Sequence, residues 1–336
     1  MTITEGKKSS PARRPLGRPV PAEGEDGLFT QSWYPVCVSS SVTPGNIYST
    51  SFLGGRVVAV RAPDGSARVL SAYCPHVGAD LAVGRMVDSE IRCAFHGWRY
   101  NHEGLCTATG NGDGVPNSAR LFAFPTMEKH NIVYAFNGTE PFFSIPDFPY
   151  PDSELVYHSY ILDKTLPVDP WVVMANTPDI AHMEQLHGFT TLSSGYDHVE
   201  FTEHSFSTRA HAILPTGQTI DWAVGIWGTT IFFQHGTIDG RWFGLSIPCG
   251  IPEIGSSNFF ISLAVKPLEG ETPEDTQNFI EYVHSVELLL ASDDLPVWST
   301  VHFRPGTLTR GDRVLSKFLE SIRRWPRAHP SAEFIR

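Results

Sequence analysis

Long apolar runs are missing from this sequence of 336 residues. No stretch approaches the roughly 20 apolar residues that a membrane-spanning helix needs, so we expect no transmembrane helix. Positive charge is also scarce, because 25 Lys and Arg against 36 Asp and Glu give a formal net charge of −11. Nucleic acids and anionic membranes attract Lys and Arg. We therefore expect neither as a partner and favour a small-molecule enzyme.

Cysteine is scarce and odd in number. The chain has five cysteines at irregular spacing (Cys37, Cys74, Cys93, Cys106, Cys249). This pattern predicts no disulfides and a reducing, cytoplasmic location. Arg13-Arg14 is followed by a proline-rich segment and not by an apolar core, so we expect no export signal.

Nucleotide-binding glycine patterns are lacking too. The run from Gly110 to Gly114 is not GxGxxG, and no helix pattern follows it.

What the sequence does contain is a pair of short loops that each offer a thiolate and an imidazole. The first is Cys74-Pro75-His76 and the second runs from Cys93 to His96. A [2Fe–2S] centre with two Cys on one iron and two His on the other needs this set. Cys2His2 would also satisfy tetrahedral zinc, and such residues can simply be packed side chains. Gly78 and Gly97 favour the cluster, because they let backbone amides approach its sulfides.

The surrounding residues carry a family resemblance. The run CPHxGAxLxxG, continued by CxFHGWxYxxxG from Cys93 to Gly104, resembles the Rieske domain of the Rieske non-haem iron oxygenases. The resemblance implies a [2Fe–2S] cluster bound by Cys74, His76, Cys93 and His96. Val77 departs from the pattern, since many relatives have Arg there. We interpret this as a change in the surroundings of the cluster or in a partner contact.

A second informative stretch runs from Asn176 to Gly188. Thr177 and Pro178 predict a helix start, with Asp179 in the first turn and on the same face as His182. His187 lies five residues beyond His182, so the helix must bulge or break if both imidazoles bind one metal. Two His and one carboxylate select non-haem Fe(II). The alternative is a capped helix whose histidines are surface or packing residues.

A similar stretch occurs in the same family. The pattern NxxDxxHxxxxHG is similar to its mononuclear-iron motif, which implies His182 and His187 as iron ligands and Asn176 and Asp179 as catalytic residues.

A third segment offers the carboxylate. Thr272-Pro273-Glu274-Asp275 predicts a helix start, and apolar residues then recur at helical spacing until an expected end near Ser292. Asp293 and Asp294 follow. The run DLPVW resembles the family segment that carries the carboxylate ligand, which implies Asp294 as the third iron ligand and leaves Asp293 beside it or solvated. The alternative is that both acids are solvated.

The chain divides into three predicted regions: a flexible tail at 1–28, a Rieske domain at 29–140 and a catalytic domain at 141–336. The fold class is α+β, with an N-terminal antiparallel β domain followed by an antiparallel sheet and helices; the family implies a helix-grip, START-like catalytic domain. Alternating residues from 195 to 265 predict strands. Either they line an apolar cavity or they are core, and the candidate lining residues are Trp222, Ile226, Phe232, Phe233 and Phe243.

The resemblance implies a terminal oxygenase that uses O2 and electrons from NAD(P)H through a separate reductase, with or without a ferredoxin. The expected reaction is hydroxylation or oxidative demethylation of a small, largely apolar molecule. The alternatives are aromatic cis-dihydroxylation and a Rieske electron carrier without catalysis. The family also implies a head-to-tail homotrimer, in which the carboxylate of Asp179 bridges His182 to His96 of the next chain. A zinc-stabilised binding module is a further alternative.

Overall fold

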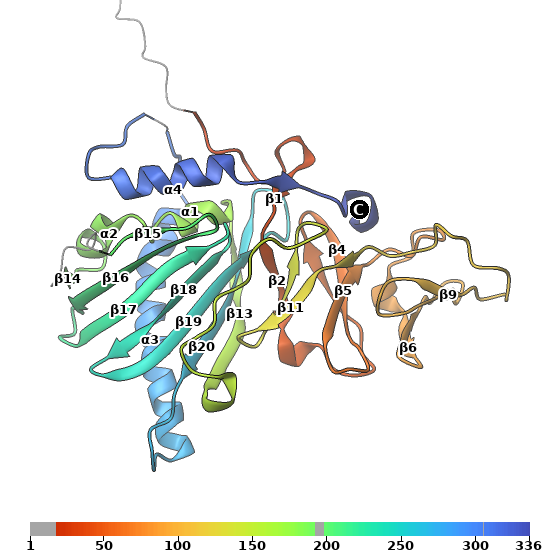
Figure 1. Cartoon of the computed structure of the whole chain (residues 1–336), viewed down its shortest axis with the longest axis horizontal. Helices are drawn as coiled ribbons and strands as arrows, with labels where there is room; N and C mark the ends of the chain where they lie inside the picture. Colours follow the sequence, from red (N-terminus) through yellow and green to blue (C-terminus); the bar gives the residue numbers. More distant parts are fainter. Residues whose placement is uncertain (1–17, 192–197, 305) are drawn as a thin grey trace, which may run out of the picture.

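Small antiparallel sheets occupy one end of the protein, and a large antiparallel sheet with helices occupies the other (Figure 1). The computed structural model describes residues 18–191, 198–304 and 306–336. The expected α+β class, with a β-rich first part and a second part that combines sheet and helices, is confirmed.

The first part is built from short strands and turns. Its elements are η1 Glu25–Gly27, β1 Phe29–Thr30, β2 Trp33–Val38, η2 Ser39–Ser41, β3 Tyr48–Phe52, β4 Gly55–Arg61, β5 Ala67–Ser71, η3 Leu81–Val83, β6 Arg85–Val87, β7 Glu90–Arg92, β8 Arg99–Tyr100, β9 Cys106–Ala108, β10 Ala123–Phe124, β11 Thr126–Lys129 and β12 Ile132–Phe136. They form sheets of order β10-β5-β4-β3, β11-β12-β2 and β6-β7-β8-β9. Pro63-Asp64-Gly65 are residue types that favour a hairpin turn, and they join β4 to β5, where Gly65 takes the positive φ of 85° that the turn requires.

The second part is a large curved sheet with helices against it. Its elements are η4 Asp152–Glu154, β13 Val156–Leu166, α1 Pro170–Met174, α2 Ile180–Gln185, β14 Thr190–Thr191, β15 Glu200–Phe201, β16 Ser205–Ile213, β17 Thr219–Trp227, β18 Ile231–Ile238, β19 Arg241–Gly250, β20 Ser257–Val265, α3 Pro273–Trp298, α4 Arg313–Arg324, β21 Arg327–Ala328 and α5 Ala332–Ile335. The sheet order is β13-β20-β19-β18-β17-β16-β14, with β15 paired to β16.

The long helix α3 crosses one face of the large sheet (Figure 1). It begins at the predicted helix start, where Thr272 and Asp275 form a capping box by bonding to each other's backbone N–H groups. Phe279, Ile280 and Val283 are buried against the sheet. This packing fixes which side of α3 faces the sheet.

Helix α3 is longer than the sequence predicts. It does not end near Ser292 but continues through Pro296 to Trp298, so Asp293 and Asp294 are helical. A proline inside a helix costs a hydrogen bond and a steric clash. The helix persists because Leu295 and Trp298, on either side of the proline, pack against the core.

Helix α2 also differs from its prediction. It begins at Ile180 with Asp179 as its N-cap residue, and not at Thr177. Thr177 instead belongs to the turn after α1, where its N–H donates to the carbonyl of Met174. The chain thus continues the turns of α1 before the second helix starts.

The two parts of the fold share buried contacts. Strand β18 starts at Ile231, and the two threonines before it bond to residues of the first part. Thr229 Oγ1 lies 2.7 Å from Thr30 Oγ1, and Thr230 Oγ1 donates to the carbonyl of Trp33 at 2.7 Å. The two predicted domains therefore pack closely together. The boundary between residues 140 and 141 stays a prediction.

Residues 18–28, which we expected to belong to the flexible tail, carry one buried acid. Glu23 is 4% exposed, and its carboxylate accepts from the backbone N–H and the hydroxyl of Thr30, both at 2.9 Å. Burial raises the pKa of Glu23 to about 7, although the bonds from Thr30 and the charge of Arg327 oppose the shift. This part of the chain is therefore anchored on the fold.

Replacing this acid should change how stability depends on pH. The pKa of Glu23 is about 7 in the folded protein against 4.5 as its ordinary value. Its contribution is therefore fully present below the lower value and is lost as the pH rises through the higher one. We expect wild type to lose about 2.5 kcal/mol more than Glu23→Gln between about pH 5 and pH 8. Denaturant titrations at a series of pH values measure this, with exposed Glu25→Gln as the control. Equal slopes for wild type and Glu23→Gln would contradict it.

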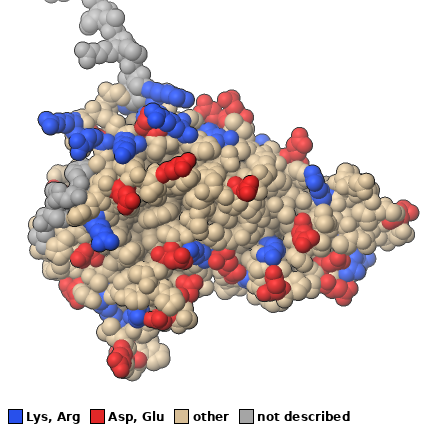
Figure 2. All heavy atoms as spheres, viewed as in Figure 1, with Lys and Arg blue, Asp and Glu red and all other residues tan. Residues whose placement is uncertain are grey.

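Charged side chains are spread over the surface, with both signs interspersed (Figure 2). Basic residues gather along α4, where Arg313, Lys317 and Arg324 are exposed. Among the described helices, none combines the length and the apolar character that crossing a membrane requires.

Candidate functional site

The two Cys–His loops adopt the same backbone turn. The N–H of Gly78 donates to the carbonyl of Cys74 at 2.8 Å, and the N–H of Gly97 donates to the carbonyl of Cys93 at 3.1 Å. Both glycines have positive φ, 83° and 70°. Glycine adopts this conformation without the penalty that a side chain would add. The two loops therefore hold their Cys and His side chains on equivalent turns.

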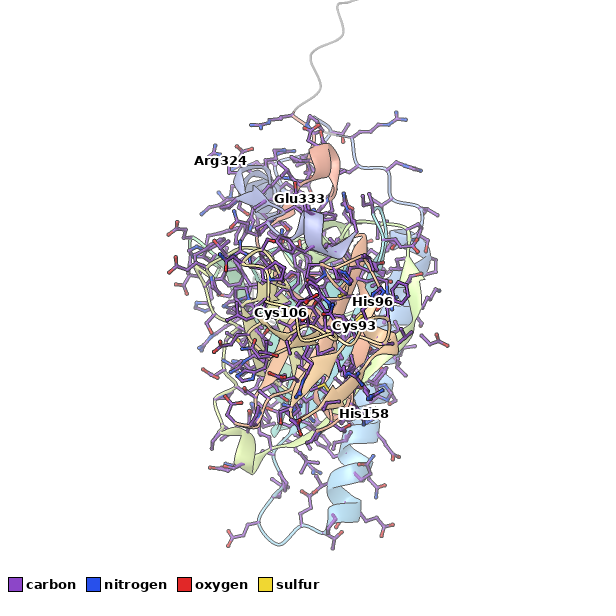
Figure 3. The ribbon with its side chains drawn as sticks, turned by 90° about the vertical axis from the view of Figure 1, so that its right-hand side faces the viewer. Cys93, His96, Cys106, His158, Arg324 and Glu333 are labelled. Carbon is purple, nitrogen blue, oxygen red and sulfur yellow. The ribbon has the colours of Figure 1, made fainter. Side chains whose placement is uncertain are left out.

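The cysteines of these loops point inward and the histidines point outward. Cys74 and Cys93 are 2% and 3% exposed, whereas His76 and His96 are exposed and their ring centroids lie 4.7 Å apart. Figure 3 shows Cys93 and His96 at the near end of the molecule. The structure brings the two imidazoles together beside the loops that carry the buried thiols, and the assignment of all four side chains to one cluster stays a prediction.

The surroundings of the four side chains fit an iron–sulfur cluster. Tyr100 Oη lies 3.0 Å from Cys74 Sγ, and the ring of His76 stacks on Trp98. Burial raises the pKa of the Cys74 thiol, so a thiolate there needs a cation beside it, which a metal provides. Paired soft sulfur and imidazole donors on two loops match the mixed ligand set of a Rieske centre.

The need for glycine at position 110, beside this site, has a steric explanation. A Cβ on Gly110 would lie 1.7 Å from the carbonyl oxygen of His96. Only glycine therefore allows the 110–114 loop to pack on the loop that carries His96. Val77 and Phe95, at 57% and 66% exposure, add an apolar surface beside the two histidines.

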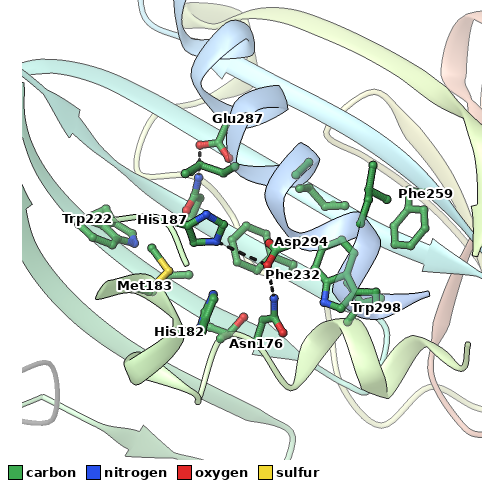
Figure 4. A pocket seen from close by; sticks show the side chains of 18 of the residues that line it. Asn176, His182, Met183, His187, Trp222, Phe232, Phe259, Glu287, Asp294 and Trp298 are labelled. Atoms are coloured by element: carbon green, nitrogen blue, oxygen red, sulfur yellow. Dashed lines mark hydrogen bonds and ion pairs between the residues drawn. The ribbon is translucent and has the colours of Figure 1, made fainter. Parts of the chain in front are cut away.

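The second group of predicted residues meets about α2 and α3. Donor atoms of His182, His187 and Asp294 all lie within 4.8 Å of one another. The helix does break between the histidines, as predicted: α2 ends at Gln185, and Gly188 has a φ of +66°. Because His187 lies beyond the helix end, its ring turns back toward His182 (Figure 4).

Further groups orient these donor atoms. His187 Nε2 lies 3.5 Å from Asp294 Oδ1, and its Nδ1 lies 3.4 Å from Asp293 Oδ2. Asn176 Nδ2 donates to Asp294 Oδ1 at 2.9 Å. Burial acts to lower the pKa of His187, but the carboxylates of Asp294 and Asp293 outweigh it and raise the pKa. A carboxylate behind a histidine is the usual support for a metal ligand.

The contact between Asp179 and His182 differs from the one predicted. The ring of His182 hydrogen-bonds to the backbone carbonyl of Asp179 and not to its carboxylate. This follows from the position of Asp179 as the N-cap of α2, where its carbonyl faces the first turn of the helix. The carboxylate itself is half-buried, and burial raises its pKa, against the opposing charge of His182.

A mainly apolar cavity of about 190 Å³ opens beside the His–His–Asp group (Figure 4). Its lining includes Trp222 and Phe232, which the sequence suggested. The other three candidates do not line it. Phe233 lies in the core on the opposite side of the sheet from its neighbour Phe232. Ile226 and Phe243 face the same side as the lining residues Val224 and Ile247, but they lie in the core farther along their strands.

Sequence reasoning missed polar residues in this cavity. Gln234 and Glu287 both line it, and Gln234 Nε2 donates to Glu287 Oε1 at 2.6 Å. The available signal was an acid placed two helical turns before Asp294, within an otherwise apolar stripe of α3.

Comparisons with known proteins agree with this geometry. Residues 32–124 match the Rieske [2Fe-2S] domain family. The chain is 28% identical over 207 residues to cholesterol 7-desaturase nvd 1 of Ciona intestinalis, which covers 59% of this chain and 43% of that protein. It is 32% identical over 127 residues to the 3-chlorobenzoate-3,4-dioxygenase oxygenase subunit of Comamonas testosteroni, covering 37% and 29%. The chain thus matches less than half the length of these relatives.

Solved structures cover nearly the whole chain. Dicamba monooxygenase bound to 3,6-dichlorosalicylic acid superposes with a TM-score of 0.68 at 16% identity, covering 88% of this chain and 97% of that one. Pseudomonas putida CBB5 NdmB superposes with a TM-score of 0.67 at 16% identity, covering 87% and 89%. At this identity the likeness establishes the fold, and that fold is shared with Rieske oxygenases.

Proposed function

We propose that this chain, which carries a Rieske [2Fe-2S] domain and resembles the Rieske oxygenases in sequence and fold, is the terminal oxygenase component of an O2-dependent system. The observation that carries the proposal is the convergence of His182, His187 and Asp294 beside an apolar cavity. A Rieske electron carrier needs no such second group. Two His and one carboxylate with room beside them are typical of non-haem Fe(II).

Each proposed ligand has a defined role. Cys74, His76, Cys93 and His96 would hold the [2Fe–2S] cluster, which supplies one-electron transfer. His182, His187 and Asp294 would hold the mononuclear iron, where O2 is activated. Asn176 positions Asp294 by donating to its Oδ1, and Asp293 positions His187 through Nδ1. These bonds fix the rings and the carboxylate before any metal is bound.

The cavity supports a compact, largely apolar substrate. At about 190 Å³ it is comparable with the ~150 Å³ engineered cavity that admits benzene. Hydroxylation or oxidative demethylation of such a molecule is the reaction we propose. Aromatic cis-dihydroxylation is the second candidate, favoured by the similarity to a dioxygenase subunit.

Electrons would come from NAD(P)H through a separate reductase, with or without a ferredoxin, in the cytoplasm. We further propose a head-to-tail homotrimer in which the Asp179 carboxylate accepts from His96 of the neighbouring subunit. The exposed imidazoles of His76 and His96 and the apolar Val77 and Phe95 beside them suit such a contact.

Metal analysis of the purified chain tests the proposal. We expect about three irons per chain, a brown colour and a rhombic EPR signal after dithionite reduction. Oxygen uptake with a surrogate reductase and a panel of compact ring compounds should be coupled to a product whose mass changes by one oxygen, two oxygens or a methyl group. About two irons without coupled uptake would indicate the electron carrier, and a colourless zinc protein would refute both readings.

A further inference from the structure

One acid in the cavity has no evident role in holding metal. Glu287 lies on α3 and lines the cavity, where most of the other lining side chains are apolar. Its Oε1 accepts from Gln234 Nε2 at 2.6 Å. Within the residues that the structure describes, no hydrogen bond to the other carboxylate oxygen is found. That oxygen is an acceptor available to whatever occupies the cavity.

The environment of Glu287 is unfavourable for a carboxylate without a further donor. Burial raises the pKa of Glu287 to about 7, even though the bond from Gln234 and the charge of His187 act to lower it. Gln234 is itself only 6% exposed and is committed to this bond. A buried carboxylate is stabilised by each additional hydrogen bond it accepts.

The distance from Glu287 to the proposed iron site suits a single ring. Glu287 precedes Asp294 by seven residues on one helix, which is two turns and about 10 Å along the axis. A hydrogen bond of about 2.7 Å followed by one ring and a short substituent spans this length. A ligand held at Glu287 would therefore place its far end beside His187 and Asp294.

We propose that the Gln234–Glu287 pair is the polar anchor of the substrate site, where Glu287 accepts a hydrogen bond from a hydroxyl or N–H group of a compact ring compound. The inference rests on the proposed function, since it assigns the substrate class of the same cavity. Gln234 holds the carboxylate in position, and the apolar walls contact the ring. Substrates without a donor at the end remote from the iron bind less tightly.

The test compares two probes of nearly equal shape, 4-ethylphenol and ethylbenzene, by calorimetry on the iron-loaded chain without reductant. Three variants are measured beside wild type: Glu287→Leu, Glu287→Gln and the control Glu281→Gln. Glu281 is an exposed acid on the same helix, so the control makes the same chemical change away from the cavity. Glu287→Gln keeps the side-chain volume and covers the case in which leucine disturbs the packing.

The measured quantity is the ratio of the two dissociation constants. A hydrogen bond to a charged acceptor predicts that wild type prefers 4-ethylphenol by about tenfold or more. Glu287→Leu should lose at least about tenfold of this preference, Glu287→Gln should lose part of it, and Glu281→Gln should keep it. An unchanged ratio in both Glu287 variants, or no binding of 4-ethylphenol to wild type, overturns the inference.

The proposed function is judged by different measurements. The preference for 4-ethylphenol could be absent while the chain still contains the mononuclear iron and a reducible cluster. In that case the oxygenase assignment stands and only the anchor is wrong. If the mononuclear iron is missing, the function fails whatever the ratio is.

Discussion

The Asp294→Ala variant is expected to keep its [2Fe–2S] cluster and lose its mononuclear iron. Asp294 is the carboxylate of the His182, His187 and Asp294 group, and it is 8% exposed. Alanine leaves two neutral donors and removes the negative charge that favours a divalent cation. The cluster ligands lie in the first part of the fold, on loops that α3 does not form, so their metal content should not change.

The expected size of the effect is large. Loss of a group behind a ligand typically costs 10–100-fold in metal affinity, so loss of the ligand itself should cost at least about 100-fold, with turnover falling in step. Total iron should drop by about one per chain while acid-labile sulfide and the visible spectrum stay the same.

Asp293→Asn is the matched control for this variant. Asp293 is adjacent in sequence, and its carboxylate contacts Nδ1 of His187 and not the shared donor site. We expect Asp293→Asn to retain iron at saturating concentration while binding it about 10-fold more weakly. Full iron occupancy in Asp294→Ala would show that the wrong acid has been assigned.

The Asp179→Ala variant is expected to keep both metal centres and stop making product. The ring of His182 is held by the backbone carbonyl of Asp179, which alanine also provides. The iron site should therefore survive the loss of the side chain. Only the carboxylate proposed to join His182's segment to His96 of the neighbouring subunit is removed, so electrons reach the cluster and go no further.

Turnover of Asp179→Ala should fall by at least about 100-fold, which is the upper end of what losing a carboxylate partner of a ligating histidine costs. Stopped-flow spectroscopy should show normal reduction of the cluster and no reoxidation on adding O2 and substrate. Glu184→Gln, an exposed acid on α2, serves as the control and should turn over normally. Normal single-turnover reoxidation in Asp179→Ala would contradict the proposed route.

Local sequence was sufficient wherever the chemistry is carried by neighbouring residues. The thiol and imidazole of each loop are two or three residues apart, and the glycines that shape the turns follow directly. The capping box at Thr272 and the hairpin about Gly65 are also local, because turn and cap preferences act over a few residues. These features appear in the structure as the sequence predicts.

The cavity was less predictable because it depends on strand register. Phe232 lines it while its neighbour Phe233 stacks on Phe148 on the other side of the sheet. Both are equally apolar in the sequence, and a shift of one residue would exchange them. Short turns join β17, β18 and β19 and set their register, but the face that lines the cavity is the one on which α3 packs, and α3 is distant from these strands in the chain.

Residue identity and short-range spacing were enough to predict the candidate metal donors, their division into two groups and the α+β class. Only the packed structure shows that α3 runs on past Ser292, that Asp294 meets His187, and that Gln234 meets Glu287. Each of these depends on which buried surfaces pack together. Such packing joins residues far apart in the chain, and no local preference encodes it.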